Sequence, residues 1–581
     1  MKKLHILAIA AFSTAVLTGC NDFLDDNRYP LTSIVNSPEY WSNAANCQLQ
    51  VDRFTDELSQ AYGTSANGWF LFKTLSDDQV GSSFANWAYP AETSDVSEWN
   101  FRVIRGCNYV IEGVAASSLS ASEKANFTGI ARMVRGYKYY TLVRMFGDVT
   151  WEDKVVDIND TEILYGPRTP RDEVMDNVVA DLQYAIENIA ADDSKTTWSK
   201  DYARAILSEV ALYEGTFCRY RTQTDNGLAP NEERAKKYLE ISASASEYLL
   251  GKYGFCDDYQ SIYNSVWTAD AANGLTGLSS NPELIVGRRY DAVNGRNSII
   301  AYTCSSTTTS GMSLDGFNAF LFKDGKPRAT TSLDNTLVGV PEVDGESKAL
   351  SIQNLLDVRE ERLSIMTDPY VYYQGMTWSR HGASGMTSSS GFGVAKFDNI
   401  NLPLNVRTND SQGYTSAPIY WTSYIACNYA EAKAELGQFD QTAFNKSLKK
   451  LYERAGLGAI ITGPDYLASL NDPDNNMGVS SLLWEVRRCR RCELMFDNWI
   501  RYWDLVRWHQ LDLLDSTKHP NVLRGAYVAN SPVLPGGTSV DGEGFYRSYT
   551  NERTFSPKYY LYPIPTAQIT LNPELGKNPN W

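Results

Sequence analysis

Apolar residues recur with helical spacing over the first half and the last third of the chain. Between residues 124 and 146 they lie three, four or five positions apart, and Gly147 and Asp148 then supply a stop signal. This spacing predicts a helix that packs along one stripe. The same spacing predicts further helices at 171–190, 202–217, 233–250, 419–436, 442–455 and 481–509.

The predicted helices follow one another in pairs, and small Ala residues alternate in them with large Tyr or Leu residues. An Ala lets a partner helix approach closely, so the spacing favours helix hairpins of the tetratricopeptide type. Plain α-helical packing is the alternative, because the repeat signature is loose. Both arrangements give a mainly α fold.

Residues from about 256 to 415 are rich in Gly, Ser, Thr and Asn, with short apolar runs such as Leu284-Ile285-Val286. This composition predicts loops and short strands between helical parts at about 20–255 and 416–581. The chain exceeds the ~250–300 residues at which a single core usually stops growing, yet no low-complexity linker divides it. We therefore expect one compact body with lobes, in which the long irregular part shapes a functional surface.

The beginning of the chain has the pattern of a secretion signal. Two Lys residues precede an apolar run, 6–17, that is shorter than the ~20 residues of a spanning helix. The run ends on Leu-Thr-Gly-Cys, which predicts a lipoprotein signal peptide at 1–19 and lipidation of Cys20. An ordinary secretory signal with an incidental cysteine is the alternative. No later stretch has 18 uninterrupted apolar residues, so acyl chains on Cys20 are the expected membrane anchor.

Charge and composition narrow the class of ligand. The net charge of −16 becomes −18 once residues 1–19 are removed, and nucleic acid binding needs the opposite sign. Neutral sugars and peptides meet no such repulsion, and a local basic pocket for a charged glycan also stays open. The 36 Tyr and 14 Trp residues exceed what packing alone demands, so we expect some of them to contact ligand.

Cysteine and histidine argue against a disulfide framework and a zinc site. Eight cysteines are scattered after Cys20, so few or no disulfides are expected. The one close pair, Cys489 and Cys492, has no second pair nearby, and only three His remain after residue 19. The oxygen-rich run 471–476 could hold a structural Ca²⁺, but ordinary turn chemistry is the favoured explanation. We expect no other cofactor or metal.

Three segments match long motifs. The run 484–508 follows R-x-E-L-x-F-E-x-x-R-x-x-D-L-x-R-W nearly throughout, and 132–149 follows A-R-x-x-R-A-Y-x-Y-x-x-L-V-x-x-F-G-D-V-P. Residues 560–579 follow Y-P-I-P-x-x-E-x-x-x-N-P-x-L-x-Q-N-P. With the lipidation motif, these segments resemble the SusD/RagB family of Bacteroidetes surface lipoproteins. The sequence departs from the family pattern at structural positions, namely Asp497, Asn498, Gln568 and Thr150.

The resemblance implies a SusD-like fold of tetratricopeptide-like helix pairs with a long loop-rich ligand-binding region. It also implies a non-catalytic glycan-binding lipoprotein, anchored in the outer membrane and facing the cell exterior. Such a protein captures oligosaccharide or polysaccharide and delivers it to a TonB-dependent, SusC-like transporter. Fructan, starch and other glycans stay open as cargo.

Sugar recognition needs flat apolar faces beside planar polar groups, and two irregular segments offer both. The segment 74–99 combines acids, an amide and aromatic rings, and the segment 370–392 combines rings with a guanidinium. Neighbouring irregular segments add weaker candidates. The predicted ligand-binding residues are Asp77, Asp78, Asn86, Trp87, Tyr89, Tyr290, Cys304, Tyr373, Trp378, Arg380 and Tyr414. For Trp87 the alternative is a packed hydrophobic side chain, and for Arg380 it is a surface ion pair.

Two other functions stay open at this point. A surface glycoside hydrolase would need two carboxylates ~5–10 Å apart with one pKa raised. Asp77 and Asp78 are adjacent and would point apart in most backbones, so they suit a clamp for sugar hydroxyls better than an acid/base pair. A peptide-binding member of the same family is the second alternative, although the aromatic loops favour sugar.

Overall fold

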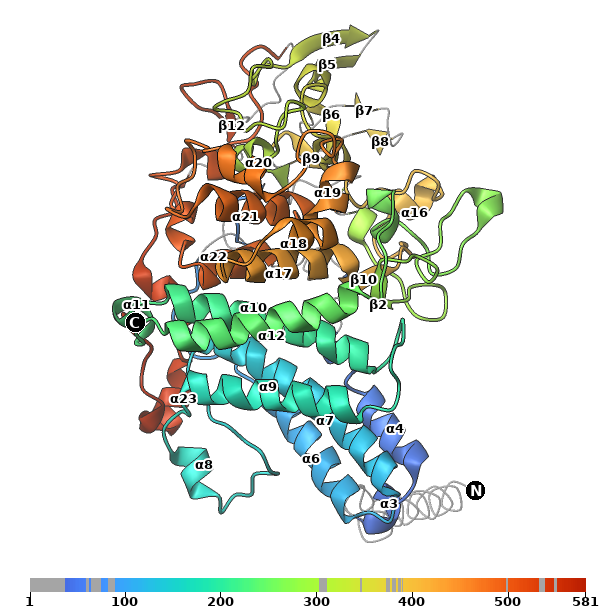
Figure 1. Cartoon of the computed structure of the whole chain (residues 1–581), viewed down its shortest axis with the longest axis vertical. Coiled ribbons are helices and arrows are strands. Elements are labelled where there is room, and N and C mark those ends of the chain that lie inside the picture. Colours follow the sequence, from blue (N-terminus) through green and yellow to red (C-terminus); the bar gives the residue numbers. More distant parts are fainter. Residues whose placement is uncertain are drawn as a thin grey trace, which may run out of the picture.

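The computed structural model describes residues 37–58, 62–63, 75–81, 89–301, 303, 311–344, 347–371, 377–378, 383–384, 388, 390–497, 500–531, 539–547 and 551–581. The fold is mainly α, as predicted, with two layers of helices and a cap of short strands (Figure 1). Most buried apolar side chains form one continuous cluster that reaches through both layers. Within the described part of the chain, no helix combines the length and the apolar character needed to cross a membrane.

The first layer lies in the lower half of Figure 1. α7 packs against α6 and α9, and α10 packs against α9 and α12, so successive helices form tetratricopeptide-like pairs. Ser120 caps α7 through a reciprocal capping box with Glu123. The helices of this layer are α3 (Pro38–Trp41), α4 (Ala44–Asp52), α5 (Thr55–Leu58), α6 (Arg102–Ala116), α7 (Ala121–Phe146), α8 (Thr161–Tyr165), α9 (Arg171–Asn188), α10 (Lys200–Tyr220), α11 (Gln223–Asn226) and α12 (Glu232–Leu250).

The second layer stacks on α10 and α12 and is drawn in orange in Figure 1. α17 packs on α10 and α12 with one side and on α21 with another. Its helices are α17 (Thr422–Glu435), α18 (Gln441–Lys446), α19 (Leu448–Arg454), α20 (Pro464–Ser469), α21 (Ser481–Glu493) and α22 (Ile500–Arg507). The chain then returns to the first layer, where α23 (Thr566–Leu571) lies and the Tyr562 N–H donates to the Met145 carbonyl at 2.7 Å.

Most of the described strands and several short helices lie between residues 256 and 415, that is, between the sequences of the two helix layers. One of them is β2, which contains the predicted run 284–286. The strands are β1 (Gln79–Val80), β2 (Leu284–Arg288), β3 (Gly311–Met312), β4 (Val340–Asp344), β5 (Ser347–Ser351), β6 (Thr367–Val371), β7 (Thr377–Trp378), β8 (Ala383–Ser384), β9 (Phe392–Val394), β10 (Ala417–Trp421), β11 (Ser539–Val540) and β12 (Tyr546–Arg547). The described sheets are β4-β5-β6-β9 and the pairs β1-β3, β2-β10, β7-β8 and β11-β12. The remaining helices are α13 (Leu314–Asn318), α14 (Gln353–Leu356), α15 (Glu361–Met366), α16 (Leu404–Thr408) and the 3₁₀ turns η2 (Tyr259–Ile262), η3 (Ala271–Asn273), η5 (Leu511–Leu514), η6 (Pro520–Val522), η7 (Pro557–Tyr560) and η8 (Pro573–Leu575).

Four helix predictions need correction. The predicted helix 481–509 is broken, because α21 ends at Glu493 and Phe496 adopts a left-handed conformation with φ 68°. The predicted helix 442–455 breaks at Ser447, whose φ of −122° and ψ of −79° leave the helical range. The predicted helix 419–436 begins three residues late, because 417–421 pairs as β10. α7 is buried on more than one stripe, since α6 and α9 both pack on it.

Candidate functional site

Two strand pairings and one packing contact bring parts of the predicted ligand-binding segments to one place, which we call the strand junction. β1 pairs antiparallel with β3, with Val80 opposite Gly311, so the chain after β1 and the chain before β3 meet at one end. β6 pairs with β9, with Val371 opposite Phe392, so the segment between them starts and finishes together. β3 packs against β9, and a Cβ on Gly311 would collide with the hydroxyls of Ser388 and Ser390. Only glycine permits this close approach.

Several predicted residues fall outside the described part of the chain. These are Cys20, Asn86, Trp87, Cys304, Tyr373 and Arg380. Trp378 lies in β7, of which only the backbone is described. The chain before Asn86, the chain after Cys304 and both ends of the segment that carries Tyr373 and Arg380 lie at the strand junction. Their roles in binding therefore stay predictions, although the segments that carry Asn86 to Arg380 all connect to the strand junction.

Asp77 and Asp78 lie just before β1 and are almost fully buried. The Arg501 guanidinium from α22 donates to both carboxylate oxygens of Asp77, at 2.7 and 2.6 Å. Arg491 from α21 donates to Asp78 at 2.7 Å and to Asp315 of α13 at 2.7 Å. The predicted clamp for sugar hydroxyls is thus corrected, because arginines already occupy both carboxylates and tie the strand junction to the second helix layer.

The two aspartates respond differently to burial. Burial raises the pKa of Asp77, but Arg491 and Arg501 lower it by more, so its pKa lies below the usual value. For Asp78, burial and the neighbouring charge of Asp77 outweigh Arg491 and raise the pKa to about 6. Its Oδ2 atom has no hydrogen-bond partner among the described residues, which fits a carboxyl that readily takes up a proton.

Three of the four predicted tyrosines belong to the described part of the chain, and each has contacts of its own. Tyr290 is 4% exposed and donates its hydroxyl to the Tyr62 carbonyl at 2.7 Å, so packing explains it and no face is open to ligand. Tyr89 is half-buried and stacks on Tyr559 with ring centroids 4.2 Å apart. Tyr414 is half-buried, with the Arg296 guanidinium 5.4 Å from its ring centroid.

A cleft of about 470 Å³ opens beside the strand junction, between α13, α21, α22 and the turn before α21. Asp77 forms part of its wall. Sequence analysis did not single out most of this wall, although several of its arginines lie within the 484–508 motif. The lining residues are Asp77, Asp315, Asn318, Ala319, Pro327, Arg328, Asp472, Pro473, Asp474, Asn476, Met477, Trp484, Arg487, Arg488, Arg491, Arg501, Leu513, His519 and Asn521.

Most charges in this cleft are compensated. Arg487 pairs with Glu435 at 2.8 Å, and Arg488 pairs with Glu485 at 2.9 Å and with Asp472. The indole N–H of Trp484 donates to Asp472 at 3.0 Å. Guanidinium groups, carboxylates and an indole ring are the groups that bind sugar hydroxyls and the apolar face of a sugar ring. Ion pairing also accounts for Asp472 within the run considered for Ca²⁺.

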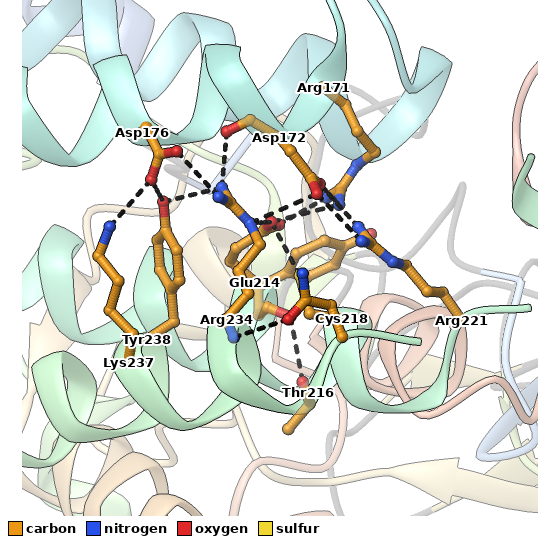
Figure 2. Close-up of polar contacts among 12 residues, drawn as sticks. Arg171, Asp172, Asp176, Glu214, Thr216, Cys218, Arg221, Arg234, Lys237 and Tyr238 are labelled. Atoms are coloured by element: carbon orange, nitrogen blue, oxygen red, sulfur yellow. Dashed lines mark hydrogen bonds and ion pairs between the residues drawn. The ribbon is translucent and has the colours of Figure 1, made fainter. Parts of the chain in front are cut away.

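Within the described ranges, one group has the spacing of a metal site, and it lies elsewhere, between α9 and α10. It consists of Asp172, Glu214 and Cys218. Figure 2 shows three arginine side chains directed at these carboxylates. Arg171 and Arg234 donate to Glu214 at 2.6 and 3.2 Å, and Arg221 donates to Asp172. Burial and Glu214 raise the pKa of the Cys218 thiol. Arginine side chains thus already pair with these carboxylates, and the group links three helices.

Family comparison decides the identity. The SusD family model matches residues 305–581, and a model described as starch-binding associating with outer membrane matches residues 22–212. The chain belongs to the SusD family. The predicted recognition and fold class are confirmed. The SusD-family fold explains why the helix pairs and the motif segments at 132–149, 484–508 and 560–579 occur in one chain.

Among curated relatives, two SusD-like proteins of Formosa agariphila show the range of sequence identity and coverage. P25 is 23% identical over 44% of this chain and 46% of its own length. P2 is 40% identical over 31% of this chain and 39% of its own length. The chain thus spans less than half the length of the curated SusD-like relatives that it matches.

Solved structures of SusD-like proteins share the fold over nearly the whole chain. A SusD-like carbohydrate binding protein from Bacteroides fragilis has a TM-score of 0.66 at 21% identity, covering 92% of this chain and 99% of its own. A laminarin binding SusD-like protein has a TM-score of 0.53 at 14% identity, covering 92% and 99%. At these identities the likeness concerns the SusD fold alone.

Proposed function

We propose that this SusD-family protein captures glycan at the cell surface and delivers it, uncut, to a TonB-dependent, SusC-like transporter in the outer membrane. The observation that carries the proposal is the strand junction, where the two aromatic-rich predicted segments, 74–99 and 370–392, come together with the chain that follows Cys304. The printed names of similar proteins, carbohydrate binding and laminarin binding, support the ligand class. Fructan, starch and other glycans are the candidate cargoes.

The proposal includes the site of action. Acyl chains on Cys20 would hold the protein at the outer membrane with its body facing outward. The family model described as associating with outer membrane supports this place.

Asp77 and Asp78 do not suit a hydrolase. Glycosidases keep one carboxylic acid and one carboxylate free to face the scissile bond. Here both side chains are almost fully buried, and each is bonded to a guanidinium. A binding protein needs no such free pair, so this arrangement supports capture without cleavage.

Calorimetry of the lipid-free protein against fructans, α-glucans, plant and host glycans and peptides tests the proposal. We expect saturable heat with one glycan class, about tenfold weaker binding in Trp87→Ala and Arg380→Ala, and no new reducing ends. Tyr165→Ala is the control, because this tyrosine is 58% exposed on α8, away from the strand junction. Released sugar would overturn capture without cleavage, binding of peptides alone would replace the ligand class, and no binding at all would remove the proposal.

A further inference from the structure

One arginine of the cleft is uncompensated. Arg328 lies in the turn after Gly325, is half-buried, and has no carboxylate within ion-pair distance among the described residues. Among the described residues its guanidinium makes one hydrogen bond, a long one of 3.4 Å from Nε to the Asn335 carbonyl. The other four arginines of the cleft each pair with at least one carboxylate. Arg328 is therefore the guanidinium with bonding capacity left for a ligand.

A second arginine, which makes no ion pair with the described residues, lies behind this turn. Arg359 is 2% exposed, donates to the Phe320 carbonyl at 2.8 Å, and stacks on Phe322 with 3.8 Å from guanidinium carbon to ring centroid. Burial, and next the charge of Arg328, lower the pKa of Arg359 to about 9, although the charge of Glu360 opposes them. A buried cation that is repelled by its neighbour is stabilised when an anion arrives nearby.

The acids of the cleft do not offset these two arginines. Asp77, Asp315 and Asp472 are engaged by Arg501, Arg491 and Arg488. Asp474 is exposed at the rim, where solvent screens its charge. Arg328 is thus the one arginine of the cleft without a carboxylate partner among the described residues, although the chain as a whole carries −16.

We propose that this cleft binds an anionic glycan, with Arg328 holding a carboxylate or sulfate group and Trp484 contacting a sugar ring. A planar guanidinium offers two parallel N–H donors to either acid group. His519 and Asn521, which also line the cleft, offer further polar contacts to hydroxyls. This inference rests on the proposed function and names the ligand class of a cleft beside the strand junction.

Calorimetry with matched ligands tests the inference. Trigalacturonate supplies carboxylates, a chondroitin 4-sulfate disaccharide supplies sulfate, and fully methyl-esterified trigalacturonate and maltotriose are neutral counterparts. The variant is Arg328→Gln, and the control is Arg102→Gln, whose side chain is 79% exposed on α6. Because the Arg328 side chain makes only one, long hydrogen bond to the described residues, its replacement should leave the melting temperature unchanged.

We expect one acidic ligand to bind the wild type, to bind about tenfold or more weakly to Arg328→Gln, and to bind Arg102→Gln normally. Binding should weaken as NaCl is raised. Equal binding of acid and methyl ester, unchanged binding to Arg328→Gln, or binding of neutral glycans only would each overturn the inference while glycan capture stands. Binding of no glycan at all would overturn both.

Discussion

Arg491 binds Asp78, which lies 413 residues earlier in the chain, and Arg501 binds Asp77, which lies 424 residues earlier. Sequence spacing cannot reveal such partners, so the adjacent acids suggested contact with ligand. In the structure the motif arginines of α21 and α22 neutralise them and position the strand that leads into the predicted ligand-binding segment. Residues of the family motif thus support the candidate site through contacts with residues far away in the sequence.

The pKa of Asp78 leads to a prediction for stability. Its folded-state value of about 6 exceeds the ordinary 3.8, so between these values the folded protein keeps a proton that the unfolded chain has released. This carboxyl's contribution to stability is full below pH 3.8 and is lost as the pH rises through 6. We expect the free energy of unfolding of the wild type to fall relative to that of Asp78→Asn between about pH 4 and pH 7.

Urea unfolding across this pH range measures the difference. Asp474→Asn is the matched control, because this aspartate is exposed at the rim of the same cleft. Its profile should run parallel to the wild type. Parallel profiles for the wild type and Asp78→Asn would show that Asp78 is not protonated in this range.

At the scale of elements, Glu214 shows how the helix pairs are joined. It is fully buried in α10 and accepts from Arg171 of α9 and Arg234 of α12 (Figure 2). Removing the charge would leave buried guanidinium groups short of a counter-ion. We expect Glu214→Gln to lower the free energy of unfolding by about 3–5 kcal/mol, measured by urea denaturation.

Glu232→Gln is the control for this substitution. Glu232 begins α12 and pairs with Arg219, but its side chain is 69% exposed. Exposed pairs contribute roughly 0–1 kcal/mol, so its replacement should change stability little. Equal effects of the two substitutions would mean that the buried network adds nothing beyond a surface pair.

Helix prediction succeeded where apolar spacing and termination agree. α7 ends at Phe146, before Gly147 with φ 73°, as its stop signal predicts. It failed at Phe496, because apolar spacing continues through residues 494–499 and no glycine marks the left-handed turn. It failed again at Ser447, a residue that helices tolerate. Such breaks depend on tertiary packing, which a single sequence does not display.

At the scale of the whole molecule, the candidate site was predicted in part. The irregular segments were located from Gly, Ser and aromatic content, but their common origin follows from β1–β3 and β6–β9 pairing across more than 200 residues for the first pair. Nothing in the sequence pointed to Arg328 as a candidate binding residue, because it became one only through its lack of a carboxylate partner among the described residues. Tyr290 was predicted to bind ligand but is buried, since a buried tyrosine and an exposed tyrosine look alike in sequence.

The central helix of the first layer, α10, contacts helices of the second layer, and these contacts predict that the two layers unfold together. Ser208 of α10 accepts from Asn428 of α17 at 3.0 Å, and Thr216 accepts from Arg507 of α22 at 3.0 Å. Both first-layer residues have no exposed surface. Because α10 is covered by both layers, loss of α17 and α22 would expose one of its packed faces. We therefore expect α10 to lose its protection together with the second layer.

Hydrogen exchange measured by mass spectrometry at increasing urea concentrations tests this cooperativity. Peptides from α10, α17 and α21 should lose protection at the same urea concentration. Peptides from α8, none of whose residues is buried, should exchange earlier and serve as the internal control. If α10 stayed protected after α17 and α21 had exchanged, the first layer would be an independent domain. The ion pairs that join Asp77 and Asp78 to α21 and α22 would then open without it, and the strand junction would separate from its helical support before the molecule unfolds.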